Sequence, residues 1–390
     1  GKAESATAYF GALRRHYIDK SIKRDFDHLS KVRGGDVGVA GRSSDDKKWL
    51  VVYMDGGPMR FYSYERASGN VEFLFTDHGV LEKYQLAKRS SVVIKTRDGL
   101  QFPAQVFLPP NKSLGKDNTT KKPLPMLVYV HGGPFVAYPW NSWYTNRTFQ
   151  LLANRGYAVM RVEFRGAGGF GKKMIEAGNL EWGGKMDEDV EDAVEWAISK
   201  GITTRSRVGI YGWSYGGYAT LSALAFAPDK YACGFALYPV SDLNVLAQWS
   251  DLMRRKLGDP STEKGKAHLK KTSPLFHVGR IKRPLLITHG GRDNRAIPSH
   301  SDRLVEAMKK AEKPITYLYY PAEAHDYREP ENWESLFAVA ERFFSEHLGG
   351  LYEPVGTELD GKGYEIKAGA KLIPGLGSAV RNADSASQTN

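Results

Sequence analysis

The sequence predicts an α/β fold in which a mostly parallel β-sheet is covered by helices on both faces. From position 123 onward, short apolar runs of strand length alternate with stretches of helical length. Continuous apolar strands separated by helices are typical of a parallel sheet that is buried on both faces. In chain order, the expected strands are 124–130, 158–164, 207–211, 233–238, 284–289 and 315–320, and the expected helices are 142–155, 185–200, 219–225, 299–311 and 331–347.

The first ninety residues show a different pattern. Three short strand-like runs are separated by two tight turns, and such an arrangement predicts a β-meander with the size of one propeller blade. A full propeller needs at least four blades, and no second copy of the meander is found, so it resembles only part of a propeller. The three runs are 48–54, 60–64 and 71–75, and the two turns are 55–58 and 67–70.

The chain is therefore expected to have three parts. Residues 1–90 form an N-terminal extension that contains the meander, and residues 91–350 form the main α/β domain, beginning with two further strands at 91–95 and 102–108. Residues 351–390 form a C-terminal extension. We expect it to be partly disordered, because its last residues are small and polar.

Composition excludes several classes of function. The net charge is +11, but lysines and arginines are scattered among acids, so no nucleic-acid partner is expected. No apolar run approaches 18 residues, so no membrane span is expected. The one cysteine, Cys233, lies in an apolar run and is expected in the core, and metal-ligand spacings are absent, so we expect no metal or cofactor. The sequence leaves open whether the soluble protein is cytoplasmic, secreted or periplasmic.

A G-x-S-x-G motif lies where a strand gives way to a helix. It reads Gly212-Trp213-Ser214-Tyr215-Gly216, between an apolar strand and a small-residue helix. A serine on such a sharp turn projects its hydroxyl from the sheet, and the flanking glycines avoid collisions with neighbouring backbone. The motif predicts a nucleophile elbow with Ser214 as nucleophile; the alternative is a glycine-rich turn with an incidental serine.

A serine nucleophile needs a base, and both partners are expected after later strands. Asp293 follows the strand at 284–289 and is the candidate acid; its alternative role is to cap the next helix. His325 follows the strand at 315–320 and is the candidate base; its alternative is a surface histidine. Asp326 is a rival acid, but its position next to His325 makes contact with the far ring nitrogen difficult.

The oxyanion of an acyl-transfer reaction needs two hydrogen-bond donors. The backbone N–H of Tyr215 is one candidate, because it follows the nucleophile. The second is expected from the loop His131-Gly132-Gly133-Pro134, where paired glycines allow close approach to a substrate. The alternative is an ordinary turn at the end of a strand.

Taken together, these motifs resemble the prolyl oligopeptidase family of serine peptidases, in its acylaminoacyl-peptidase-like branch. The resemblance covers about residues 45–350, with all motifs in order. It implies an α/β-hydrolase catalytic domain, and it likens the meander to the last part of the family's N-terminal propeller. Ninety residues cannot hold that propeller, so the chain is expected either to be a fragment or processed product or to come from a lineage that has lost most of that domain. The partners considered are a missing propeller segment and a second copy of the chain. The matching stretches are HGGPF (131–135), EFRGAGGFG (163–171), EWGGKMDEDVEDAVEWA (181–197), GWSYGGY (212–218), HGGRDNRAIP (289–298) and AEAHDY (322–327).

The resemblance also assigns roles to individual residues. It carries Ser214, Asp293 and His325 over as the catalytic triad. It assigns the second oxyanion N–H to Gly133, with Gly132 as the next candidate for this donor. Arg295 matches an arginine that binds a substrate carbonyl; the alternative is a surface salt bridge. The chain departs from the family in the longer spacing from acid to proline and in Asp326, where a glycine is usual. Candidates for an apolar substrate pocket are Phe135, Trp213, Tyr218, Val240 and Trp249; for all of them except Phe135 the favoured alternative is a place in the core.

The sequence thus predicts a serine hydrolase that cleaves peptide bonds of short or N-acylated peptides through an acyl-enzyme on Ser214. The alternative is a carboxylesterase with the same triad, which acts on acyl esters. A non-catalytic scaffold would be expected to lack at least one triad member, and none is lacking. The preference at the cleaved bond and the oligomeric state are not readable from the sequence.

Overall fold

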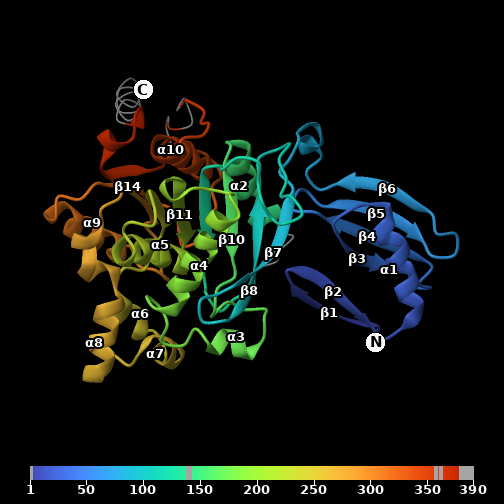
Figure 1. The fold of residues 1–390 in the computed structure, drawn as a ribbon, viewed down its shortest axis with the longest axis horizontal. Coiled ribbons are helices and arrows are strands. Elements are labelled where there is room, and N and C mark those ends of the chain that lie inside the picture. Colours follow the sequence, from blue (N-terminus) through green and yellow to red (C-terminus); the bar gives the residue numbers. More distant parts are fainter. Residues whose placement is uncertain (1–2, 138–142, 355–358, 360–362, 377–390) are drawn as a thin grey trace.

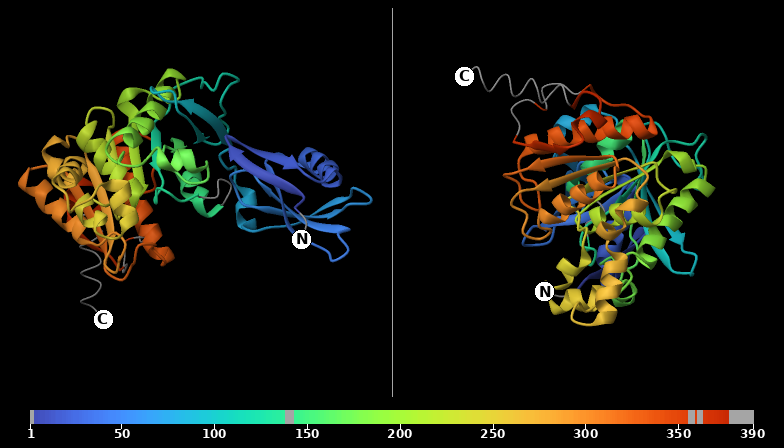
Figure 2. Two further views of the ribbon diagram at one scale, coloured as in Figure 1. Left: turned by 90° about the horizontal axis from the view of Figure 1, so that it is seen from below. Right: turned by 90° about the vertical axis from the view of Figure 1, so that its left-hand side faces the viewer.

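The computed structural model describes the chain except for residues 1–2, 138–142, 355–358, 360–362 and 377–390 (Figure 1). A smaller N-terminal lobe, which contains β1 to β6, lies beside a larger body built on one sheet. Figure 2 shows the lobe projecting from the side of that body. Within the described residues, no helix has the length and apolar character that a membrane span needs.

The larger body confirms the α/β fold and its mostly parallel sheet. Nine strands of the described chain run in the order β15-β14-β13-β12-β11-β9-β10-β8-β7. Neighbours from β10 through β14 are parallel, whereas β7, β8 and β15 join antiparallel at the two edges. The strands are β7 (Arg89–Lys95), β8 (Gln101–Phe107), β9 (Met126–Val130), β10 (Ala158–Val162), β11 (Val208–Trp213), β12 (Cys233–Leu237), β13 (Leu285–Gly290), β14 (Ile315–Tyr320) and β15 (Glu365–Ala368).

Helices cover both faces of this sheet (Figure 1). The two faces follow from the alternation of side chains along each strand. In β9, Met126, Val128 and Val130 enter one apolar cluster, and Leu127 and Tyr129 enter the other. The first cluster also takes side chains of α4 (Lys185–Ser199), α5 (Tyr215–Phe226) and α9 (Ser299–Lys310), and the second those of α2 (Trp143–Asn154) and α10 (Pro330–Leu348).

Shorter elements complete the body. The segment between β12 and β13 is helical, which the sequence did not predict, and it begins at the carboxyl edge of the sheet, where β12 ends. The expectation that the end of the C-terminal extension is disordered concerns residues 377–390, which lie outside the described residues. The remaining helical elements are α3 (Lys172–Glu176), α6 (Leu243–Ala247), α7 (Asp251–Leu257), α8 (Glu263–Thr272) and the 3₁₀ turns η1 (Gly79–Lys83), η2 (Arg205–Arg207), η3 (Pro274–Arg280) and η5 (Ala370–Leu372).

The N-terminal lobe contains the expected meander and more. The meander is joined by one further strand into a four-stranded antiparallel sheet, and a hairpin and a helix precede it. The helix α1 packs Ile22, Phe26 and Leu29 against this sheet, a spacing typical of one helix face. The elements are β1 (Ser5–Phe10), β2 (Ala12–Tyr17), α1 (Lys20–Val32), β3 (Asp36–Arg42), β4 (Lys48–Met54), β5 (Arg60–Glu65) and β6 (Val71–Thr76).

Candidate active site

Ser214 occupies a strained turn between β11 and α5. Its backbone has φ 57° and ψ −115°, a region that residues with a side chain rarely adopt. The flanking glycines are required by space: a Cβ at Gly212 would lie 2.2 Å from the carbonyl oxygen of Val130, and one at Gly216 would lie 1.9 Å from it. The strand, the turn and the helix therefore form the elbow that the motif predicts, with Ser214 at its apex.

His325 and Asp293 form a directly bonded pair. The Nδ1 atom of His325 lies 2.7 Å from Oδ2 of Asp293, so this nitrogen donates to the carboxylate. The other oxygen, Oδ1, accepts the backbone N–H groups of Arg295 and Ala296 at 2.8 and 3.0 Å. Both residues follow the ends of neighbouring strands, β13 and β14. Asp293, rather than Asp326, is thus the acid that contacts the ring.

A second buried histidine supports the acid. His289, on β13, donates from Nε2 to the carbonyl oxygen of Ala296 at 2.6 Å and lies 3.5 Å from Oδ2 of Asp293. Burial alone would raise the pKa of Asp293, but the two histidines and the N–H of Arg295 lower it below its ordinary value. Asp293 is therefore charged at neutral pH. It can hold the imidazole in one orientation and stabilise the imidazolium.

Two of the three candidate triad residues line one cavity, and Asp293 is bonded to His325 behind it. The cavity has a volume of about 230 Å³ and is lined by Ser214, His325 and the loop after Asp293. Within the described residues no hydrogen bond joins Ser214 to His325; in unliganded sites such bonds often tighten only when substrate binds. The other lining residues are Gly132, Gly133, Val136, Trp182, Trp213, Tyr215, Tyr238, Val240, Leu246, Trp249, Met253, Arg295, Ala296 and Asp326.

Not every expected pocket residue lines this cavity. Trp213, Val240 and Trp249 do, but Tyr218 is buried in the core, where its hydroxyl donates to Thr272. Phe135 also lies outside the lining; its ring packs against the core, with the Nζ atom of Lys256 4.9 Å from the ring centroid. Val136, the next residue along, takes its place at the cavity. The sequence analysis did not name Trp182, Tyr238, Leu246 or Met253 as lining residues. Leu246 and Met253 come from the helical segment after β12, which was not predicted, and Trp182 comes from the 181–197 motif.

The glycine pair after β9 is positioned by the histidine that precedes it. The ring Nδ1 of His131 lies 2.7 Å from the carbonyl oxygen of Gly132, so Nδ1 donates this bond. That carbonyl and the N–H of Gly133 belong to one planar peptide unit and point in opposite directions. Fixing the carbonyl on the buried side therefore directs the Gly133 N–H away from it. Gly133, with φ 114°, lines the cavity that also contains Tyr215.

A buried ionic group holds this histidine. The Nε2 atom of His131 lies 3.3 Å from Oε2 of Glu163, and the Nε atom of Arg161 donates to Oε1 at 2.7 Å. Burial would raise the pKa of Glu163, but Arg161 and His131 lower it, so the carboxylate is charged. The sequence reasoning missed both partners, although charged residues inside the expected strand 158–164 were a signal of this pairing.

Arg295 and Asp326 form an ion pair at the mouth of the cavity. Their side chains are 61% and 69% exposed, and the Nη1 and Oδ2 atoms are 3.5 Å apart. An exposed pair of this kind contributes little to stability. The pair therefore holds neither side chain firmly in place. Among the described residues, no group of three or more His, Cys, Asp or Glu side chains is arranged to hold a metal ion.

Comparisons with known proteins agree with this site. The sequence profile of the prolyl oligopeptidase family matches residues 143–351. The chain is 38% identical to dipeptidyl aminopeptidase BIII of Pseudoxanthomonas mexicana, over 98% of this chain and 56% of that protein. It is 36% identical to dipeptidyl peptidase family member 6 of Caenorhabditis elegans, over 86% of this chain and 48% of that protein. The chain thus spans about half the length of these relatives.

A solved structure shows the same fold. Acylaminoacyl peptidase of Pyrococcus horikoshii superposes with a TM-score of 0.68 over 83% of this chain and 52% of that one, at 23% sequence identity. At this identity the likeness concerns the fold, which is the α/β-hydrolase fold that the sequence predicts.

Proposed function

This chain belongs to the prolyl oligopeptidase family, and from that premise we propose that it is a serine peptidase that cleaves short peptides through an acyl-enzyme on Ser214. The observation that carries the proposal is the bonded pair of His325 and Asp293 beside a serine on a strained elbow. Residues 91–350 would form the catalytic unit. A carboxylesterase with the same residues is the second candidate.

The reaction follows from this arrangement. Nε2 of His325 accepts the proton of the Ser214 hydroxyl as the oxygen attacks the substrate carbonyl. Asp293 keeps the ring in the tautomer that leaves Nε2 unprotonated at the start, and it stabilises the imidazolium that forms. His325 then gives the proton to the leaving nitrogen, and a water molecule releases the acyl group by the same steps in reverse order.

Charge develops on the carbonyl oxygen during attack. The N–H groups of Gly133 and Tyr215 are the proposed donors, with Gly132 adjacent. Backbone donors fixed before the reaction stabilise this oxyanion without reorganisation. The interaction is stronger in the transition state than in the bound substrate, so it raises kcat rather than only lowering KM.

The cavity favours an apolar residue on the acyl side of the cleaved bond. Its walls carry three tryptophan side chains together with Val240, Leu246 and Met253, and Arg295 at the mouth can donate to a substrate carbonyl. The similarity to a relative named dipeptidyl aminopeptidase supports substrates with a free amino terminus, whereas the motif resemblance supports N-acylated ones. We propose short peptides as the substrate class that includes both.

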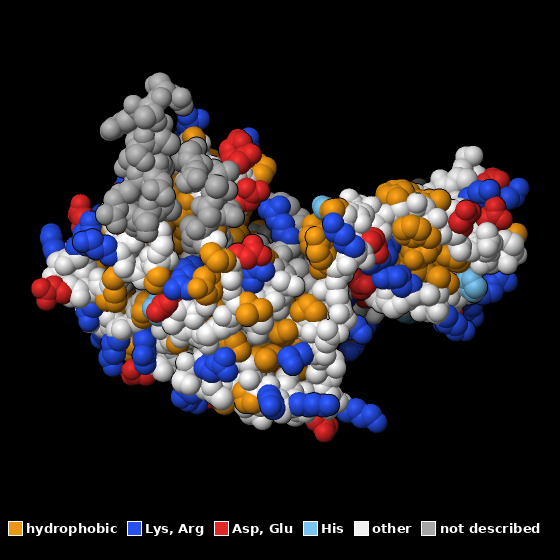
Figure 3. Space-filling view, turned by 90° about the horizontal axis from the view of Figure 1, so that it is seen from above, with side chains coloured by type: hydrophobic (Ala, Val, Ile, Leu, Met, Phe, Trp, Pro, Cys, Tyr) orange, Lys and Arg blue, Asp and Glu red, His pale blue; other side chains and the backbone are white. Residues whose placement is uncertain are grey.

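Association is a further part of the proposal. The outer strand β6 exposes Phe73, Leu74 and Phe75, each about half accessible, at the edge of its sheet. Figure 3 shows hydrophobic side chains gathered on the N-terminal lobe. An exposed apolar edge strand is a pairing surface. It suits association with a propeller segment or with a second copy of the chain.

The proposed activity can be tested with three substrate types that share an apolar acyl residue. Hydrolysis of a dipeptidyl p-nitroanilide, an N-acetyl-aminoacyl p-nitroanilide and the matching p-nitrophenyl ester is measured for the purified chain and for Ser214→Ala. We expect at least one anilide to be cleaved by the native chain and none by Ser214→Ala. Cleavage of the ester alone would favour the carboxylesterase. Equal rates in the native chain and Ser214→Ala would contradict both functions.

A further inference from the structure

The segment after β10, residues 163–168, touches both sides of the proposed oxyanion site. The ring of Phe164 stacks on His131, with centroids 4.8 Å apart, and lies 5.1 Å from the ring of Tyr215. His131 directs the Gly133 N–H, and Tyr215 carries the other donor. Phe164 is fully buried, so it acts as a spacer between the residues that place the two donors.

The same segment also supports the loop that follows the glycine pair. The N–H of Gly168 donates to the carbonyl oxygen of Val136 at 3.2 Å. A Cβ at Gly168 would lie 2.5 Å from the carbonyl oxygen of Phe135 and 2.6 Å from the carbonyl carbon of Val136. The two loops therefore pack backbone against backbone, and a displacement of one moves the other.

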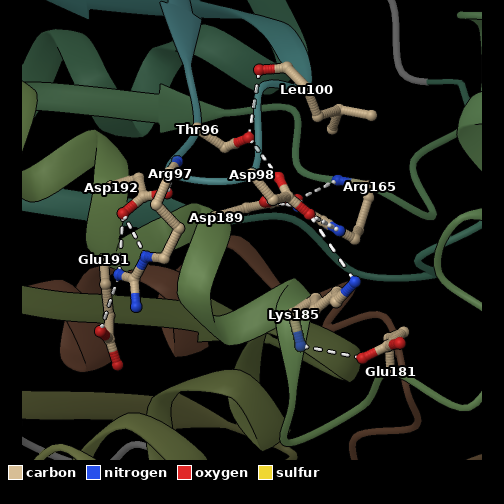
Figure 4. Close-up of polar contacts among 10 residues, drawn as sticks. All are labelled: Thr96, Arg97, Asp98, Leu100, Arg165, Glu181, Lys185, Asp189, Glu191 and Asp192. Carbon is tan, nitrogen blue, oxygen red and sulfur yellow. Dashed lines mark hydrogen bonds and ion pairs between the residues drawn. The ribbon is translucent and has the colours of Figure 1, made fainter.

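Arg165 anchors this segment to two other parts of the fold (Figure 4). Its Nη1 and Nη2 atoms donate to the two carboxylate oxygens of Asp98, at 2.8 and 2.9 Å, in the turn between β7 and β8. Its Nε and Nη2 atoms donate to Asp189 on α4 at 2.9 and 2.7 Å, and its backbone N–H donates to the same carboxylate at 2.8 Å. The guanidinium thus bridges two carboxylates.

This anchor is stronger than an ordinary surface contact. The side chain of Arg165 is 5% exposed and that of Asp189 is fully buried. Arg165 holds the pKa of Asp98 well below its ordinary value, so this carboxylate stays charged. Charge-assisted, bidentate bonds of arginine fix geometry in a way that lysine cannot reproduce. Breaking one partner of a buried pair leaves the other charge uncompensated.

We propose that Arg165 is a positioning residue for catalysis: by holding the 163–168 segment between Asp98 and Asp189, it sets the spacing of the Gly133 and Tyr215 N–H groups. The inference rests on the proposed function. Arg165 itself contacts neither the cavity nor a reacting atom. Its effect on rate passes through Phe164 and Gly168.

The neighbouring Arg97 provides a matched control. It lies in the same turn and donates from Nε and from its backbone N–H to Asp192 at 2.8 Å, and from Nη2 to Glu191 at 3.2 Å, so it also ties the turn to α4 (Figure 4). Within the described part of the chain, Arg97 makes no hydrogen bond or ion pair with the 163–168 segment. Loss of its bonds weakens the same junction of turn and helix but leaves the oxyanion loops supported.

The test compares Arg165→Lys with Arg97→Lys, which keep the charge of the chain. For Arg165→Lys we expect kcat to fall about ten- to hundredfold, with KM within about twofold, because the donors act in the transition state. Affinity for a peptidyl trifluoromethyl ketone, whose adduct with Ser214 carries an oxyanion, is expected to fall by the same factor. For Arg97→Lys we expect kcat within about twofold of the native chain.

A folded Arg165→Lys with native kcat, or an equal loss in Arg97→Lys, would overturn the inference. If Arg165→Lys does not fold, Asp98→Asn decides: it removes one charged partner whose side chain is 36% exposed, and we expect a several-fold loss of kcat without a change in KM. Native kcat in Asp98→Asn would then overturn the inference. Absence of turnover in the native chain would instead overturn the proposed function, so the two failures are distinguishable.

Discussion

The two halves of the proposed catalytic centre are held in different ways. In the acid–base half, His325 bonds directly to Asp293, and both side chains project from loops at the ends of adjacent strands. In the oxyanion half, the proposed donors are backbone N–H groups, which lie beside buried side chains such as His131 and Phe164.

The two halves therefore depend on different properties of the chain. The acid–base half needs particular residue types at particular strand ends. The oxyanion half needs an accurate backbone, so its determinants are spread over residues that never meet a substrate. Substitutions in the first half are expected to remove a chemical step, whereas those in the second are expected to misplace a donor.

The largest effect is expected from Asp293→Asn. An amide can stabilise the wrong tautomer of His325 and cannot stabilise the imidazolium, so we expect kcat to fall about 10³- to 10⁴-fold. Steady-state kinetics with the best anilide would measure this. Asp326→Asn is the control, because its carboxylate pairs with Arg295 and not with the ring, and a change below about tenfold is expected. A larger loss of kcat in Asp326→Asn than in Asp293→Asn would mean that Asp326, and not Asp293, is the acid of the triad.

A smaller effect is expected from Gly168→Ala in the oxyanion half. The added methyl group would meet the backbone of Phe135 and Val136 and displace the loop that carries Gly133. A shift of about 1 Å at a donor reduces rates by roughly a hundredfold, so a ten- to hundredfold loss of kcat with a native KM is expected. Gly279→Ala is the control, because no atom lies within 4 Å of its added methyl group. Equal kcat in both variants would show that the two loops are not coupled.

The last prediction concerns the stability of the fold and not the rate of the reaction. Asp187 is buried on α4, accepts a hydrogen bond from Ser222 and has no cationic partner in the described residues. Burial raises its pKa from 3.8 to about 7. The folded chain therefore keeps a proton that the unfolded chain loses above about pH 4, and stability falls as the pH rises toward 7.

Asp187→Asn removes this titration. Relative to the native chain, its free energy of unfolding is expected to improve between pH 5 and pH 8 by up to roughly 3 kcal/mol. Urea unfolding of both proteins at the two pH values measures the difference. A gap that is the same at pH 5 and pH 8 would mean that Asp187 does not titrate in this range.

The sequence predicted the sheet and the acid–base half well, for a physical reason. Strands buried on both faces need continuous apolar runs, and the elbow at Ser214 needs glycines at fixed spacings. The order of strands then places the loops after 290 and 320 at one edge. Asp293 and His325 were therefore found from position and chemistry together, although their catalytic roles remain predictions.

The rest depended on contacts between distant segments. No local pattern shows that Phe164 separates His131 from Tyr215, or that Phe135 turns toward Lys256 while Val136 lines the cavity. In the N-terminal lobe, α1 was not predicted, although it has an apolar face at positions 22, 26 and 29. The residues around these positions are mostly polar and basic. β15 was missed because a short edge strand needs only one partner and little apolar surface.

The central claim is that Ser214 is the nucleophile, and labelling with a fluorophosphonate tests it most directly. Mass spectrometry of the intact and digested protein would give the number of labels and their position. We expect one label per chain, on Ser214, with no label on Ser214→Ala and much slower labelling of Asp293→Asn. A label on another residue, or equal labelling of the native chain and Ser214→Ala, would contradict the assignment.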